Sequence, residues 1–177
     1  MKVNIITAVS SNYCIGKNNG LVLTHKEDFE YFKNMTKDSV VLMGRKTWES
    51  LGEKPLKGRK NYYITNNKGK IKLKTVIETQ KSVYKTVTIT EVNSLKEVIN
   101  FIHGMHLHKN IWVIGGGSVY KQSLEEDIVD EVYITKWNQK IDGDTFFPLL
   151  NEDIWFRKYI THPLRTCDFV FETWQKR

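Results

Sequence analysis

The segment IWVIGGGSVY, residues 111–120, decides the predicted fold of this chain. Its first four residues are apolar and mostly β-branched, which is typical of a strand buried on both faces of a sheet. Three glycines follow, and residues 118–124 are predicted to form a short helix. Such a junction exposes backbone N–H groups at a helix N-terminus, and these bind phosphate. A tight turn between a core strand and a helix is the alternative, and this segment alone leaves both interpretations open.

A second strand–glycine–helix junction lies nearer the N-terminus. Residues 39–44 predict a buried strand that ends in glycine, and residues 45–52 predict a helix that ends in glycine. Arg45 and Lys46 directly follow the first of these glycines. Two such junctions, one with two cations, favour an anionic cofactor that carries more than one phosphate.

The composition indicates one globular domain that spans residues 1–177. The chain is 40% hydrophobic and 12% aromatic, and no apolar run approaches the ~20 residues of a membrane span. The N-terminal segment is predicted to be a first strand and not a signal peptide. Cys14 and Cys167 are too few for a disulfide framework, so we expect reduced thiols and a cytoplasmic location.

The net charge of +7 is compatible with nucleic acid, a membrane surface or an anionic small molecule as partner. The lysines are scattered, with one denser segment at residues 68–74 that alternates with Gly, Ile and Leu. This alternation is typical of a solvated edge strand or loop. We therefore expect no nucleic-acid partner and no membrane partner.

The order of elements predicts an α/β fold with a mostly parallel central sheet, helices on both faces and an antiparallel C-terminal hairpin. The long polar segment 10–20 is predicted to be a functional loop. The predicted strands are residues 4–9, 39–44, 59–65, 86–90, 111–114, 130–135 and the hairpin strands near 155–161 and 169–172.

A helix is predicted to begin at Thr24, which forms a capping box with Glu27. Phe29 and Phe32 are predicted to form its buried face. Asp28 lies one turn before Phe32, on or beside this apolar face. Judged from the residues alone, an acid in the first turn that complements the helix dipole is the favoured interpretation of Asp28.

A second capping box, formed by Ser94 and Glu97, predicts a helix with an apolar face at Leu95, Val98, Ile99 and Ile102. Three histidines follow, at positions 103, 106 and 108. A metal site is one interpretation, but no cysteine is near and the segment is predicted to be a loop. We therefore expect solvated histidines and no metal site.

Six motifs in one order together resemble dihydrofolate reductase along nearly the whole chain. They are residues 15–19, 28–33, 41–50, 56–61, 113–120 and 142–148. The resemblance implies a dihydrofolate reductase-like fold and the NADPH-dependent reduction of 7,8-dihydrofolate to tetrahydrofolate, with hydride transfer to C6 of the pterin.

The resemblance also implies the residues that bind the substrate. Asp28 matches the single acid of the pterin pocket and becomes the expected catalytic residue, because a buried carboxyl with a raised pKa suits protonation at N5. Thr135 matches the threonine that hydrogen-bonds this acid, and Arg59 matches the arginine that holds the α-carboxylate of the folate tail. The apolar and backbone contacts are expected from Ile6, Ala8, Phe32, Leu51, Leu56 and Ile114.

For the cofactor, two cations near an extra phosphate favour NADPH over NADH. We expect a monomer with dihydrofolate as its partner. The implied cofactor-binding residues are Ala8, Ile15, Gly16, Leu21, Gly44, Arg45, Lys46, Thr47, Ile64, Thr65, Asn66, Ile114, Gly116, Gly117, Ser118, Val119, Tyr120 and Thr145.

The sequence departs from the family pattern just before Asp28. Val22, Leu23 and Lys26 stand where the family usually has Pro, Trp and Pro, and His25 replaces an apolar residue. The family tryptophan helps to hold a water near the substrate, so this water network is expected to differ. Residues 66–85 are longer than in compact members and are expected to be peripheral to the chemistry.

Two further hypotheses remain open. One is another pyridine-nucleotide reductase of the same fold that acts on a pyrimidine intermediate of riboflavin synthesis, against which Asp28, Thr135 and Arg59 argue. The other is a protein of a different class, either a catalytically weak relative that binds folate or antifolates or a basic RNA-binding protein. The altered residues 22–23 keep the weak relative open, because lost positioning slows an enzyme.

Overall fold

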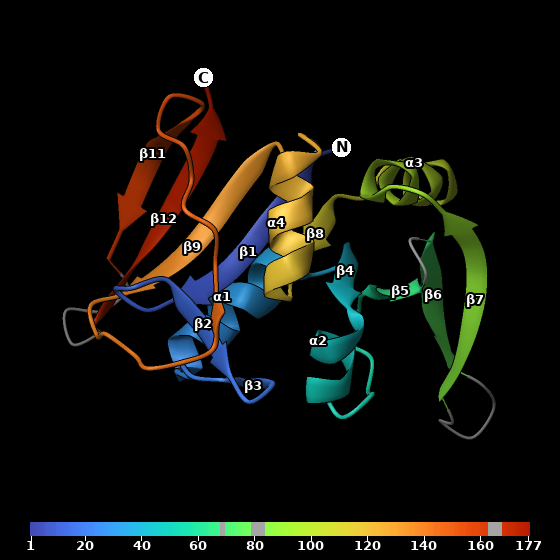
Figure 1. Cartoon of the computed structure of the whole chain (residues 1–177), viewed down its shortest axis with the longest axis horizontal. Coiled ribbons are helices and arrows are strands. Elements are labelled where there is room, and N and C mark those ends of the chain that lie inside the picture. The colour runs from blue at the N-terminus through green and yellow to red at the C-terminus, as the bar shows by residue number, and fades with distance from the viewer. Residues whose placement is uncertain (68–69, 79–83, 163–167) are drawn as a thin grey trace.

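The computed structural model of the chain describes residues 1–67, 70–78, 84–162 and 168–177. Within these residues, a nine-stranded sheet has the order β11-β12-β9-β1-β8-β4-β5-β6-β7, and a smaller sheet has the order β10-β2-β3 (Figure 1). The predictions for Cys167 and for residues 68–69 and 79–83 lie outside the described part of the chain.

The strands and helices follow closely the order predicted from the sequence. The strands are β1 (Val3–Val9), β2 (Cys14–Lys17), β3 (Gly20–Leu21), β4 (Val40–Gly44), β5 (Lys60–Asn67), β6 (Lys70–Glu78), β7 (Tyr84–Val92), β8 (Ile111–Val113), β9 (Glu131–Trp137), β10 (Thr145–Phe146), β11 (Trp155–Thr161) and β12 (Phe169–Lys176). The helices are α1 (Lys26–Thr36), α2 (Arg45–Ser50), α3 (Leu95–Met105) and α4 (Gly117–Glu125).

Five adjacent strands in the middle of the large sheet, β9, β1, β8, β4 and β5, are parallel. β11 and β12 form the predicted antiparallel hairpin beside β9, and β6 and β7 form a second antiparallel hairpin beside β5. The predicted α/β fold with a parallel centre and a C-terminal hairpin is therefore confirmed. The second hairpin is an addition that the sequence pattern did not predict as a unit.

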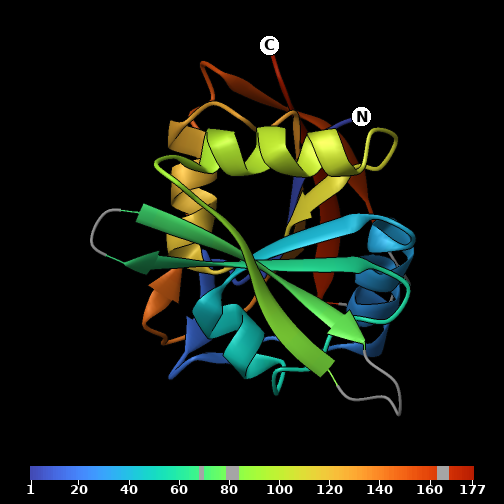
Figure 2. The same ribbon diagram turned by 90° about the vertical axis from the view of Figure 1, so that its right-hand side faces the viewer.

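Helices cover both faces of the sheet, as expected for parallel strands that are apolar on both sides. Apolar side chains of α3 and α4 pack with Val3, Ile5 and Leu42 on one face. On the other face, α1 and α2 contribute Phe32 and Trp48 to a separate apolar cluster. Figure 2 shows α4 and α1 on opposite sides of the sheet.

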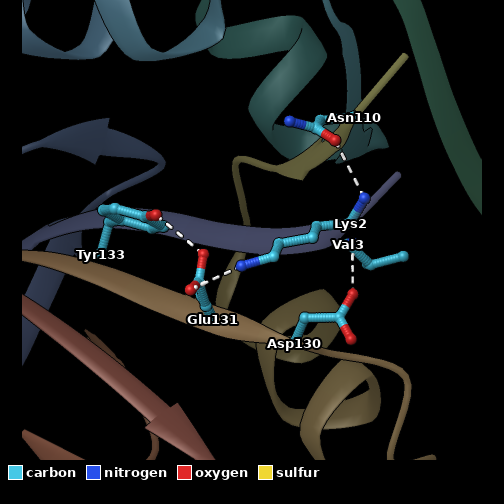
Figure 3. A network of polar contacts seen from close by, with 6 residues as sticks. All are labelled: Lys2, Val3, Asn110, Asp130, Glu131 and Tyr133. Carbon is cyan, nitrogen blue, oxygen red and sulfur yellow. Dashed lines mark hydrogen bonds and ion pairs between the residues drawn. The ribbon is translucent and has the colours of Figure 1, made fainter. Parts of the chain in front are cut away.

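Polar contacts fix the amino end of β1 between its two neighbouring strands (Figure 3). The Lys2 backbone N–H donates to Asn110 Oδ1 at 2.9 Å, just before β8, and Lys2 Nζ lies 2.8 Å from Glu131 Oε1 on β9. The Tyr133 hydroxyl donates to the other oxygen of Glu131 at 2.9 Å. These contacts hold the central strand at the end of the sheet opposite to the cleft described below.

Two segments that were expected to be loops contain strands. Residues 70–78 form β6, an inner strand with Ile71 and Leu73 buried, so the prediction of a solvated edge strand or loop is wrong. The predicted loop 10–20 contains β2 and β3, joined by a turn in which Asn18 and Asn19 have positive φ. Asparagine tolerates this conformation, and such two-residue turns close hairpins.

The predicted capping and burial of α1 need correction. His25, not Thr24, is the N-cap, because its Nδ1 accepts from the Glu27 backbone N–H at 3.2 Å. The imidazole packs edge-on against Phe169 with ring centres 5.2 Å apart, and this tertiary contact holds it at the helix end. Phe29 is 49% exposed, because it faces the cleft and not the core.

The predictions around α3 have mixed outcomes. Ser94 is the N-cap and accepts from the Glu97 backbone N–H at 3.2 Å, as predicted. The Glu97 carboxylate, however, accepts from the Asn93 backbone N–H at 3.3 Å and so does not complete the capping box as predicted. His103 lies inside α3 and not in a loop. The His106 ring is hydrogen-bonded to the Tyr62 hydroxyl at 2.8 Å, so the expectation of a fully solvated side chain is wrong for this residue.

Candidate active site

A cleft of about 800 Å³ opens where β1, β4 and β8 end. Ligands of parallel α/β sheets bind at the carboxyl ends of the strands, because the loops that follow the strands diverge there. Every residue predicted from the sequence to bind substrate or cofactor lines this cleft. The sequence positions therefore converge in space, and their contacts with ligands remain a prediction.

Asp28 is the acid at the inner end of the cleft. It lies in the first turn of α1, and Thr135 on β9 donates from its hydroxyl to Asp28 Oδ1 at 2.6 Å. Burial raises the pKa of Asp28 above its usual value, and the Thr135 bond and the nearby His25 oppose this shift. A carboxyl in such a place can accept hydrogen bonds from a ligand and hold a proton at a higher pH than a solvated acid.

Arg59 lies at the same half of the cleft, in the turn before β5. Its Nη1 donates to Thr36 Oγ1 at 3.0 Å and its Nε donates to the Lys57 carbonyl at 3.1 Å. The guanidinium lies 5.7 Å from the centre of the Phe32 ring. These contacts fix one edge of a planar cation, and such a cation suits a carboxylate ligand.

The other half of the cleft is built from the two glycine junctions. The Gly44 N–H donates to the Gly115 carbonyl at 2.7 Å, which joins the ends of β4 and β8. A Cβ on Gly115 would lie 3.0 Å from Thr47 Oγ1, and Gly115 has a φ of +135°. α4 begins after Gly116 without a side-chain cap, and its first residues, Gly117 and Ser118, line the cleft.

Cations and polar groups follow these junctions. Arg45 begins α2 and its Nη1 lies 2.6 Å from Glu49 Oε1 in an exposed ion pair. Lys46, Thr65 and Asn66 line the same half of the cleft. This half therefore presents backbone N–H groups, hydroxyl and amide groups, and two cations, a set that matches a phosphorylated ligand.

The small sheet β10-β2-β3 forms one wall of the cleft through Ile15, Gly16, Leu21 and Thr145. A Cβ on Gly117 would lie 3.1 Å from Thr145 Cγ2, so this wall packs closely against the start of α4. The wall consequently has a defined position beside the glycine junction.

The sequence model of the family described as "Dihydrofolate reductase" matches residues 2–176. The chain belongs to the dihydrofolate reductase family. It is 32% identical to the dihydrofolate reductase of Haemophilus influenzae over 179 residues, which cover 98% of this chain and 99% of the relative. The dihydrofolate reductase of Buchnera aphidicola is also 32% identical, with coverage of 99% and 96%. The resemblance inferred from the sequence is confirmed, and the protein is an enzyme of dihydrofolate reduction.

Solved structures support the same fold. A dihydrofolate reductase from Enterococcus faecalis, complexed with NADP(H) and RAB-propyl, superposes with a TM-score of 0.74 at 23% identity. The match covers 99% of this chain and 96% of that chain.

Several residues that the sequence did not predict also line the cleft of this dihydrofolate reductase. Gly115 was detectable as the first glycine of its junction, and Lys33 lies one turn after Phe29 on α1. Ile71 belongs to β6, so the expectation that residues 66–85 are peripheral is wrong at this position. The additional lining residues are Thr7, Asn19, Gly20, Leu23, Phe29, Lys33, Ser50, Ile71, Gly115 and Gln122.

The described residues contain neither a metal-binding cluster nor a membrane-spanning helix. No cluster of three or more His, Cys, Asp or Glu side chains that could hold a metal occurs there. In the same part of the chain, no helix has the length and apolar character needed to cross a membrane.

Proposed function

We propose that this protein catalyses the NADPH-dependent reduction of 7,8-dihydrofolate to 5,6,7,8-tetrahydrofolate. The observation that carries the proposal is the arrangement of the cleft, in which the half-buried Asp28 carboxyl lies in one half and the glycine junctions with Arg45 and Lys46 form the other. NADPH supplies the hydride that reduces C6 of the pterin. The residues of the chain bind and orient the two ligands and promote protonation of the pterin.

Asp28 has the position and the chemistry to bind the pterin ring. Thr135 donates to one of its oxygens, and the carboxyl has further acceptor capacity for the 2-amino group and N3–H of the pterin. Because burial raises the pKa of Asp28, a larger fraction of the carboxyl is protonated near neutral pH than in water. Asp28 therefore promotes protonation at N5, which completes the reduction begun by the hydride.

The remaining substrate contacts follow from the shape of this half of the cleft. Ile6, Phe32, Leu56 and Ile114 present apolar surface that suits the pterin and aminobenzoyl rings. Arg59, which is held in place by Thr36 and Lys57, binds the α-carboxylate of the folate tail.

The glycine half of the cleft fits NADPH. Side chains on Gly44 and Gly115 would meet Val119 and Thr47 at 3.0 Å, so a larger residue at either position would crowd this wall. Backbone N–H groups at the start of α4 suit the pyrophosphate, and Arg45 with Lys46 suits the 2′-phosphate. Residues 1–177 form a single domain in this proposal, and the protein acts as a monomer.

The test is the oxidation of NADPH by the purified protein, followed by absorbance with and without dihydrofolate. We expect oxidation only when dihydrofolate is present. Asp28→Asn is expected to lower the rate about a hundredfold or more at neutral pH, and less at acidic pH where solvent supplies the proton. Asp153→Asn, a change of an exposed acid, is the matched control with unchanged activity. Full activity of Asp28→Asn at neutral pH would refute the role of this residue.

A further inference from the structure

The first turn of α1, which carries Asp28, has little apolar packing of its own. Of the 11 residues of α1, all within the described part of the chain, only Thr36 in the last turn is buried. Phe29 is 49% exposed on the cleft side, and the ion pair between Lys26 and Glu30 is long at 3.9 Å. The position of Asp28 therefore depends on a few specific contacts at the amino end of the helix.

His25 fixes the backbone on both sides of Asp28. Its Nδ1 accepts from the Glu27 backbone N–H at 3.2 Å, and its carbonyl accepts from the Phe29 backbone N–H at 3.0 Å. The first bond satisfies a donor that no carbonyl within the helix can reach, and the second begins the helical ladder. One residue therefore orders the N–H groups of the two residues that flank the acid.

The imidazole of His25 rests on the sheet surface that also carries Thr135. Its ring centre lies 5.2 Å from that of Phe169 on β12 and 6.1 Å from that of Trp137 on β9. Phe169 and Trp137 are cross-strand partners. Trp137 lies two residues after Thr135, and side chains two residues apart on a strand point to the same face of the sheet. His25 therefore ties the start of α1 to the surface from which Thr135 donates its hydrogen bond.

We propose that His25 is a positioning residue for the reaction at Asp28, because its cap orders the first turn of α1 and so holds the carboxyl between Thr135 and the cleft. This inference rests on the proposed function. With the cap in place, the carboxyl is already oriented when dihydrofolate binds, so no ordering of the helix end opposes binding or protonation at N5. Without the cap, the first turn frays, and the productive orientation is populated for only a fraction of the time.

The proposal predicts an effect on the substrate half of the cleft alone. His25→Phe keeps an aromatic ring beside Phe169 and removes the capping acceptor. In this variant we expect the dissociation constant of dihydrofolate to rise about three- to tenfold and that of NADPH to stay unchanged. Single-turnover oxidation of NADPH by dihydrofolate is expected to slow by a similar factor. His25→Asn supplies a preferred capping acceptor and is expected to restore both quantities to within about twofold of the wild type.

The experiment measures both dissociation constants by fluorescence titration and the single-turnover rate by stopped-flow absorbance. Ser94→Ala is the matched control, because it removes the N-cap of α3, which lies outside the cleft. This control is expected to lower Tm as His25→Phe does and to leave binding and rate unchanged. In an Asp28→Asn background, His25→Phe is expected to leave the residual rate unchanged, since His25 acts through Asp28. Amide hydrogen exchange over residues 26–30 of the ligand-free protein is expected to be about three- to tenfold faster in His25→Phe than in the wild type.

Equal weakening of dihydrofolate and NADPH binding in His25→Phe would show a merely structural role and overturn the proposal, as would a His25→Asn variant that is equally impaired. If His25→Phe does not fold, His25→Leu tests the same loss of the acceptor with the same criteria. A wild type that binds NADPH but does not oxidise it with dihydrofolate contradicts the proposed function, and hydrogen exchange then tests the capping role by itself. A fully active wild type with an indistinguishable His25→Phe variant contradicts the role of His25 alone.

Discussion

Replacement of Thr135 by valine removes the hydroxyl that holds Asp28 and keeps the shape of the side chain. Thr135 is buried and donates to Asp28 Oδ1 at 2.6 Å. A hydrogen bond to an ionised group contributes about 1.5–3 kcal/mol, whereas one between neutral groups contributes about 0.5–1.5 kcal/mol. The variant is therefore expected to lose more stability when Asp28 is ionised than when it is protonated.

The direction in which the loss of stability changes with pH follows from the pKa of Asp28. Burial raises this pKa, and the Thr135 bond opposes the rise because it favours the carboxylate. Without the bond the pKa rises further, and the extra loss of stability develops as the pH increases through it. We expect a loss of about 2 kcal/mol at about pH 8 and about 1 kcal/mol at about pH 4. For a chain of this length, these losses lower Tm by about 4–8 °C and about 2–4 °C.

Thermal unfolding of the ligand-free protein at both pH values, followed by circular dichroism, measures this difference. Thr75→Val is the matched control, because Thr75 donates to the Asn61 carbonyl at 3.1 Å and no titrating acid is involved in that bond. In an Asp28→Asn background, the pH dependence of the Thr135→Val effect is expected to disappear. An equal fall in Tm at both pH values for Thr135→Val alone would refute the reasoning.

Three further predictions concern the rest of the cleft and the fold. Arg59→Lys is expected to raise the KM for dihydrofolate about tenfold in steady-state assays and to leave the KM for NADPH unchanged, because lysine loses the bidentate contact. An unchanged KM for dihydrofolate would exclude a contact between Arg59 and the folate carboxylate. Arg45→Ala is expected to weaken the binding of NADPH more than that of NADH. Glu49→Gln, which removes the ion-pair partner of Arg45, is expected to tighten the binding of NADPH. Titrations that show equal changes in binding for both nucleotides argue against a 2′-phosphate contact. Gly104→Ala is expected to raise Tm by up to about 4 °C, because a Cβ meets nothing within 4 Å there and alanine favours helix; a lower Tm contradicts this.

Much of the fold could be predicted from local patterns. The apolar run before Gly115 and the one before Gly44 became β8 and β4, and the glycines became the start of α4 and α2. The prediction failed where burial depends on distant partners. The alternating lysines of residues 70–74 suggested an exposed edge, but β7 pairs with the outer side of β6 and makes it an inner strand.

In the candidate site, too, some features could be predicted from local patterns and others depend on distant partners. The residues alone favoured a helix-dipole role for Asp28, and only the combined motifs suggested a pterin ligand. Phe29 has the spacing of a core residue, yet it is exposed because the cleft runs along that face of α1. His25 has no sequence signature of a cap and becomes one because Phe169 packs against its ring.

The sequence by itself determined the order of strands and helices, the two glycine junctions and the family, because periodicity, turn chemistry and motifs are encoded in neighbouring residues. Only the tertiary structure decided which side chains meet. Thr135 reaches Asp28 across 107 positions, and Tyr120 reaches the Ile6 carbonyl across 114, because β1 pairs with β9 and α4 packs on β1. Such contacts depend on strand register and helix placement, which are fixed by burial of the whole sheet and not by any one segment.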